Sequence, residues 1–446
     1  MKLTIKMKFG FFLLILLLPL IAFAQSGTQR EPGNIPEILD LDDCIEIALE
    51  KNYGLLIRKE TVVRNAATRL NAWSRLMPSA SMRYSWSHSG DDRYNFTETG
   101  FTVSNNHYSM GFSASQPLFA GGNNILSLKS SILNYRASEV EYTGEQKKLI
   151  YDVKQAYYTA VSAEQTLRNV EQSLERAREQ WRFVAQRDTL GLADPTEVSQ
   201  MKVTLAETEL SLLQAQNGRR QAMERLFALL SLPMDRDITL IEPNLASIET
   251  PSLDDLLEES IEQNPQIKAA ELAKYSAQLT RFSSWSGYLP SVNASYSYNW
   301  SDNSMPDGFS EIWDDATWSF GVSASWSLFS GTSRIAGVRS ANSGERSAEL
   351  TLLQAKQTIE TAVRLAYRNM EEASARIRLA DARVEDAELN ATLFREKFEL
   401  GNSTILELLQ AELSLQNALA ENVKAVYDFR MAIAELERLS GIEMDI

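Results

Sequence analysis

Residues 317–328 read TWSFGVSASWSL, and the two sides of this alternating stretch differ in kind. The even-numbered positions carry Trp, Phe, Val, Ala, Trp and Leu, whereas the odd-numbered positions carry only Thr, Ser and Gly. Strict alternation predicts a β-strand with one apolar face and one polar face. The pattern recurs in three other stretches: 79–88 (SASMRYSWSH), 107–116 (HYSMGFSASQ) and 291–300 (SVNASYSYNW).

The length and the two faces of these strands indicate a membrane-spanning sheet. Strands of about ten residues, tilted near 45°, match the hydrocarbon layer of a membrane, and Tyr and Trp near their ends fit interfacial girdles. A soluble antiparallel sandwich also has alternating strands and is the alternative. The polar face is mostly serine, which favours contact with water. We expect the following residues to line a passage: Arg83, Ser85, Ser113, Asn293, Ser295 and Ser323. Pairing with a loop acid is the alternative for Arg83.

Four strands cannot close a barrel by themselves. An open sheet edge inside lipid leaves main-chain groups unpaired at several kcal/mol each, so other copies of the chain must complete the wall. Two copies would give eight strands, three would give twelve and four would give sixteen; an eight-stranded barrel is filled by its own side chains, whereas more strands leave a water-filled lumen. The strand connections, 89–106 and 301–316, are expected outside the cell.

The chain contains a tandem duplication of one structural unit. Leu41-Asp42-Asp43 recurs as Leu253-Asp254-Asp255, and further matches follow in the same order along the chain. We assign residues 41–232 to the first repeat and 253–442 to the second. Residues 233–252, which contain three prolines, form the linker between them.

Each repeat also contains a long helix. Apolar residues alternate in steps of four and three along 149–184 and along 359–398, which predicts left-handed packing against partner helices. The first long helix is expected over about 123–189, and it ends at Gly191; the second ends at Gly401. The chain then restarts at once as a returning helix, about 194–230 in the first repeat. Because that helix is shorter, we expect an earlier helix, about 53–77, to stack end to end with it.

The N-terminus and the composition narrow the class of protein. Lysines, a short apolar run and Ala22-Phe23-Ala24 predict a signal peptide over 1–24, with a membrane anchor as the alternative, and 25–40 is a leader. A net charge of −15 disfavours nucleic-acid binding. One cysteine, Cys44, is expected to be a buried free thiol, and only two histidines are present. We expect no catalytic residue, no metal site and no cofactor.

These features together resemble the TolC-like outer membrane efflux proteins. The resemblance covers about 41–442 and is carried by residues that recur in both repeats: Asn52 and Asn264-Pro265, Pro78 and Pro290, Leu118-Phe119 and Leu328-Phe329, Gly191 and Gly401. It implies a mainly α protein with transmembrane β-strands, in which the hairpins of three copies form an α-barrel and their strands form a 12-stranded outer-membrane β-barrel. It also implies a periplasmic adaptor and an inner-membrane transporter or secretion ATPase as partners.

The resemblance further implies an entrance at the hairpin tips. Acids just beyond the tips narrow that entrance in the family, and Glu197 and Glu407 stand at such positions, although both also match capping boxes. Gln200 and Gln410 are neutral where a second acid can occur. The residues that resemble adaptor-docking tips are Leu190, Gly191, Leu192, Leu400, Gly401 and Asn402; Ser403 lacks the basic side chain of some members.

The prediction is therefore a passive export duct in the outer membrane, extending into the periplasm and surrounded by lipid at its strands. A trimeric coiled-coil adhesin is the first alternative, but strand pairs inside both repeats disfavour it. A diffusion porin is the second, and the long helices disfavour it. His88 and His107 end neighbouring strands, and we expect them to be interfacial polar residues that could approach one another. The exported substrate is not indicated.

Overall fold

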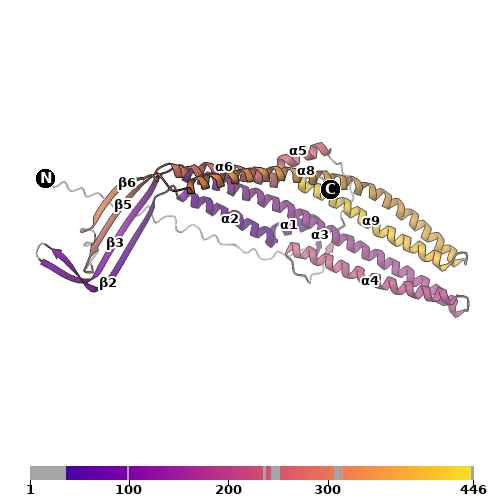
Figure 1. The fold of residues 1–446 in the computed structure, drawn as a ribbon. Helices are drawn as coiled ribbons and strands as arrows, with labels where there is room; N and C mark the ends of the chain where they lie inside the picture. The colour runs from indigo at the N-terminus through magenta and orange to yellow at the C-terminus, as the bar shows by residue number, and fades with distance from the viewer. Residues whose placement is uncertain are drawn as a thin grey trace.

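A computed structural model describes residues 37–97, 100–234, 238–242, 252–305, 312 and 315–442, without the side chains of 91–104. The predicted signal peptide lies outside this range, as do most of the leader and part of the linker. The molecule is elongated. A sheet forms one end, helices extend away from it, and the turns of the helical hairpins lie at the far end (Figure 1). Among the described residues, no helix has the length and apolar character needed to cross a membrane.

The sheet has the strand order β2-β3-β5-β6, and all its pairs are antiparallel. The strands are β2 (Ser79–Thr97), β3 (Gly100–Ala120), β5 (Ser291–Asp302) and β6 (Thr317–Ser325). Their register joins like with like: Ser81, Ser113, Ser297 and Ser319 form one row, and Met82, Phe112, Tyr298 and Trp318 form the next. The sheet therefore has one hydroxyl-rich face and one aromatic face, as the alternation predicts.

Several predicted strand boundaries are wrong. β2 continues past residue 88 to Thr97 and β3 begins at Gly100, so most of the predicted connection 89–106 is strand. The register shifts between His88 and Arg93, and such a bulge breaks the alternation from which strands are recognised. At the other end, β6 stops at Ser325 rather than 328, and the Trp326 indole donates to the Tyr288 carbonyl at 3.1 Å.

The two histidines do not approach one another. His88 lies opposite Asn106, whereas His107 lies opposite Ser87. Neighbouring positions on a strand point to opposite faces, so the two imidazoles face opposite sides of the sheet. The His88 Nδ1 atom contacts the Asn106 Oδ1 atom at 3.0 Å instead.

The helices of the two halves of the chain correspond closely. The first half contains α1 (Leu41–Lys51), α2 (Tyr53–Ser74), α3 (Asn123–Thr189) and α4 (Pro195–Leu230). The second half contains α5 (Leu253–Gln263), α6 (Pro265–Ser284), the 3-10 turn η2 (Trp285–Tyr288), α8 (Ser333–Glu399) and α9 (Ile405–Ser440). α3 and α8 each have 67 residues, or about 100 Å at about 1.5 Å per residue.

The buried face of each long helix is the predicted apolar stripe. In α8 it includes Ile359, Val363, Ala366 and Met370, which pack with Ile433 and Leu436 of α9. α2 begins where α4 ends: the Asn52 side chain donates to the Leu229 carbonyl at 2.9 Å and also caps its own helix. The stacking expected between these two helices is present.

A second core lies beside the middle of the bundle. Short strands β1 (Ile38–Leu39) and β4 (Thr239–Leu240) pair in parallel there, and Tyr157 and Leu226 are fully buried beside them. Cys44 belongs to this cluster, is completely buried and forms no disulfide, which confirms the predicted free thiol. Burial raises the pKa of its thiol to about 12, with smaller contributions from Asp43 and Asp40.

Candidate functional site

The far end of the molecule consists of two hairpin tips, which we define as residues 190–194 and 400–404. Gly191 and Gly401 have φ of +70° and +74°, in the left-handed region that favours glycine. The same main-chain bond follows each glycine, from Leu192 to the Arg187 carbonyl and from Asn402 to the Lys397 carbonyl, both at 2.8 Å. Both tips therefore close by the same helix-ending geometry.

The tips present apolar side chains to the surroundings. Leu190 and Leu400 are 72% and 76% exposed, and Leu192 is 64% exposed. Gly191, Gly401 and Asn402 are exposed beside them. Leucines this exposed gain nothing from the core of their own chain, so the residues predicted for docking form a surface on which a partner could pack.

Glu407 forms the capping box predicted for it. Its carboxylate accepts from the Thr404 main-chain nitrogen at 2.8 Å and from the Ser403 and Thr404 hydroxyls at 2.9 Å, while its own nitrogen donates to Thr404 Oγ1 at 3.3 Å. The hydrogen bond from the Thr404 main chain, followed by those from the two hydroxyls, lowers the pKa of this carboxyl. Glu407 therefore carries a fixed and persistent negative charge at the second tip.

Glu197 does not form the capping box predicted for it. Asp194 caps α4 by accepting from Thr196 at 2.7 Å, and in the described structure the Glu197 carboxylate makes no hydrogen bond to the Asp194 main chain. It forms an ion pair with Arg187 of α3 at 3.6 Å instead. At this distance the contact is electrostatic, and the Glu197 Oε2 atom is buried without a hydrogen-bond partner among the described residues. Arg187 itself donates to the Leu192 carbonyl at 3.2 Å.

The two predicted glutamines differ from each other. The Gln200 side-chain oxygen is buried without a hydrogen-bond partner among the described residues, whereas Gln410 is exposed. Neither provides a charge beside the acids.

The two hairpins of one chain pack on one another beside their tips. The rings of Phe183 in α3 and Phe398 in α8 meet edge to face, with centroids 6.0 Å apart. The Arg187 guanidinium lies 5.9 Å from the centroid of each ring. Around them Val184, Met201 and Leu408 are buried. The two hairpins therefore share one hydrophobic cluster beside their tips.

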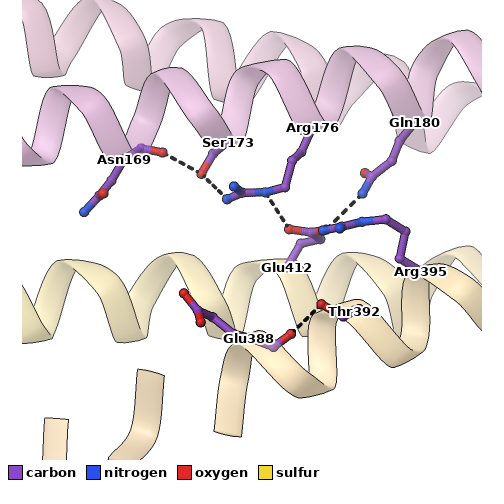
Figure 2. A network of polar contacts seen from close by, with 8 residues as sticks. All are labelled: Asn169, Ser173, Arg176, Gln180, Glu388, Thr392, Arg395 and Glu412. Atoms are coloured by element: carbon purple, nitrogen blue, oxygen red, sulfur yellow. Dashed lines mark hydrogen bonds and ion pairs between the residues drawn. The ribbon is translucent and has the colours of Figure 1, made fainter. Parts of the chain in front are cut away.

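A polar network also joins the two hairpins, and sequence reasoning missed it. Glu412 of α9 accepts from Arg176 of α3 at 3.2 Å and from Arg395 of α8 at 2.5 Å (Figure 2). Gln180 of α3 donates to the same carboxylate at 3.1 Å. The Glu412 side chain is only 16% exposed. Its one visible sequence signal is an acid placed directly beside Ala411 on the buried stripe of α9.

At the opposite end, all six residues predicted to line a passage lie on one face of the sheet. The register pairs Ser85 with Ser109, Asn293 with Ser323, and Arg83 with Gly111. The remaining two, Ser113 and Ser295, lie opposite Ser297 and Ser115 on the same face. The other face exposes large apolar side chains, including Trp318 at 68% and Met82 at 66%.

The sheet has two open edges. Among the described strands, β2 pairs only with β3 and β6 pairs only with β5. The part of the chain that the structure describes also contains no group of three His, Cys, Asp or Glu residues arranged to hold a metal ion.

Comparison with known proteins agrees with this architecture. The family model described as outer membrane efflux protein matches residues 68–231 and 256–442. The alkaline protease secretion protein AprF of Pseudomonas aeruginosa is 22% identical over 274 residues, which are 59% of this chain and 55% of AprF. The chain thus spans about half the length of this curated relative.

Two solved structures share the fold over most of their length. The CmeC outer membrane channel of Campylobacter jejuni is 18% identical with a TM-score of 0.80, covering 90% of this chain and 85% of CmeC. The outer membrane protein VceC of Vibrio cholerae is 18% identical with a TM-score of 0.77, covering 90% of this chain and 96% of VceC. At these identities the likeness is one of fold.

Proposed function

The chain belongs to the outer membrane efflux protein family, and from that membership we propose that three copies form a passive export duct. The strands of the three copies form the wall in the outer membrane, and the hairpins form a tunnel in the periplasm. Transport energy comes from an inner-membrane transporter, joined to the tips through a periplasmic adaptor. The predicted signal peptide, removed near Ala24, directs the chain out of the cytoplasm.

The open, two-faced sheet is the observation that carries this proposal. Its aromatic face suits lipid, and its serine face suits water. The unpaired edges of β2 and β6 cannot remain open in hydrocarbon. Four strands from each of three copies give a barrel wide enough for a lumen. Neither an adhesin nor a porin explains both this sheet and the paired long hairpins.

The open edges formed by β2 and β6 can pair with one another between copies. β6 has nine residues, and the segment of β2 below its bulge runs from 79 to 88, so that 79–87 can pair with the whole of β6. Antiparallel pairing of these segments from end to end puts Ser81 opposite Ser323 of the next copy and Arg83 opposite Gly321. Every such pair joins polar face to polar face, so this seam continues the wall of the duct.

The tips supply the proposed entrance and docking surface. Glu407 would form a ring of three charges under threefold symmetry, attractive to cations. Glu197 would add a weaker charge, because Arg187 lies beside it. The exposed Leu190, Leu192 and Leu400 would pack against the adaptor.

Cross-linking at the seam tests the proposal. Ser81→Cys combined with Ser323→Cys should give dimers and trimers on oxidation in outer membranes. Ser297→Cys with Ser319→Cys is the matched control, because those hydroxyls lie 2.8 Å apart within one chain and should link without changing its size. A purified protein that remains monomeric in detergent would contradict the duct.

A further inference from the structure

Where its side chains are described, the serine face of the sheet carries one arginine, at a defined level. In the segments 79–87, 107–115, 291–301 and 317–325, the side chains on this face are Ser, Thr, Asn, Gly, one His and Arg83. Among the described residues, no carboxylate lies within ion-pair distance of Arg83. A guanidinium is a planar cation with five hydrogen-bond donors, so Arg83 provides a cation on a surface of hydroxyl and amide groups.

The serines on either side of Arg83 in β2 form hydrogen bonds with serines of β3. Ser81 pairs with Ser113 and Ser85 with Ser109 through hydroxyl contacts of 2.8 and 2.7 Å. These two pairs lie on either side of the row that contains Arg83. These hydroxyls are therefore hydrogen-bonded across the two strands rather than to the guanidinium.

The row containing Arg83 also contains Gly111 and Asn299. Gly111 lies directly opposite Arg83, and a Cβ atom there would lie 2.8 Å from the Asn299 Oδ1 atom. The amide of Asn299 thus extends across Gly111 in the same row. At the seam between copies, the end-to-end pairing puts the partner's Gly321 on the other side of Arg83. Glycine on the seam side leaves room for a planar guanidinium and a bound anion, whereas the Asn299 amide covers Gly111 on the other side.

Threefold symmetry turns this position into a ring. Strands about 4.8 Å apart and tilted by about 40° give a twelve-stranded barrel a radius of about 12 Å. Arginines extend inward from that wall, so their charges lie within roughly one Debye length, about 8 Å, of the axis and act together. Rings of Arg or Lys favour anions in pores.

We propose that three Arg83 side chains form an anion-binding ring in the strand-lined part of the duct, which recognises carboxylate groups of acidic solutes on their way out. The proposal rests on the trimeric duct proposed above. It assigns opposite charges to two levels of the duct, with Glu407 at the periplasmic entrance and Arg83 in the part of the strand wall nearest the helices. A solute bearing carboxylates would be retained weakly at the ring before release.

The test uses purified full-length channels in planar bilayers, with poly-L-glutamate added to either chamber in turn. Block of the current should be stronger from the chamber that faces the strands. Arg83→Gln should weaken that block about tenfold, as expected for loss of a charge-assisted contact. Arg83→Lys should retain most of it. Ser81→Gln, which adds the same amide on the same face but keeps Arg83, is the matched control.

The outcomes separate the two proposals. Equal block of wild type and Arg83→Gln, or no block of conducting wild-type channels, would overturn the ring and leave the duct standing. A protein that forms no channel at all would overturn the duct, and the ring with it. Weakening by Ser81→Gln equal to that by Arg83→Gln would also overturn the ring, because bulk rather than charge would then be responsible.

Discussion

The side-chain amide of Asn264 joins two helices: it donates to the Leu439 carbonyl of α9 at 3.1 Å and accepts from the Gln266 nitrogen of α6 at 2.9 Å. Asn52 makes the equivalent pair of contacts in the first half. One side chain thereby satisfies the end of one helix and the start of the next. Two shorter helices thereby stack along most of the length of the long helix beside them.

Asn264→Ala should lower the free energy of unfolding by about 1–3 kcal/mol, because it removes the cap and leaves a buried carbonyl without its donor. Asn264→Asp should recover only the cap. Loss of helical circular dichroism in urea measures both effects. Asn390→Ala, on an exposed part of α8, is the control and should not destabilise. Equal stability of Asn264→Ala and wild type would contradict the joint.

Glu412→Gln should loosen the contact between the hairpins, because Arg176 and Arg395 would lose the charge that compensates them. We expect a local destabilisation of about 1–3 kcal/mol, reduced from that of a fully buried pair by partial exposure. Hydrogen exchange in α3 around Arg176 and in α9 around Glu412 should become faster. Glu372→Gln removes an exposed pair with Arg376 and should leave exchange unchanged. Protection that survives Glu412→Gln would mean that the apolar stripe alone holds the hairpins.

Gly191→Ala and Gly401→Ala should each destabilise a tip by about 1–2 kcal/mol, because φ is positive at both positions. Gly218→Ala is a matched substitution with the opposite sign. It lies inside α4, has no atom within 4 Å of an added Cβ, and should stabilise by about 0.5–1 kcal/mol. Urea unfolding compares the three variants, and the same sign for all of them would refute the assignment.

Glu407→Gln should change single-channel conductance and cation preference if the carboxylate faces the entrance. Its pKa lies below the ordinary value of 4.5, because hydrogen bonds favour the charged form. The stabilisation that this carboxylate gives to the tip is therefore present above pH 4.5 and is lost as the pH falls below it. Wild type and Glu407→Gln should differ at pH 7 and converge only in acid. Identical conductance at pH 7 would remove the gating role.

Cys44 should not react with a maleimide until the chain unfolds, because it is completely buried and its pKa is raised to about 12. Labelling followed by mass measurement at increasing urea concentration checks this. Rapid labelling of the native protein would show that the core beside β1 opens. The result also matters for the seam experiment, because an inert Cys44 leaves the introduced cysteines as the reactive ones.

Local patterns account for most elements of the fold. The bounds expected for the first long helix, 123–189, agree with α3, because proline and glycine are scarce there and the apolar steps are regular. Glu407 reaches its cap within one helical turn, as its spacing predicts. The same spacing fails at Glu197, which pairs with Arg187 of another helix. The extension of β2 beyond residue 88 could not be predicted, since a bulge changes which side chains share a face.

The sequence by itself determined the two-faced strands, the buried stripes and the glycine turns, because each depends on residues a few positions apart. The tertiary structure decided which partners meet across large separations. Glu412 forms an ion pair with Arg176. Glu197 forms one with Arg187 instead of a hydrogen bond at the start of its own helix. Such contacts depend on the axial position and rotation of one long helix against another. A regular apolar stripe allows several such alignments, and only the packed side chains select one.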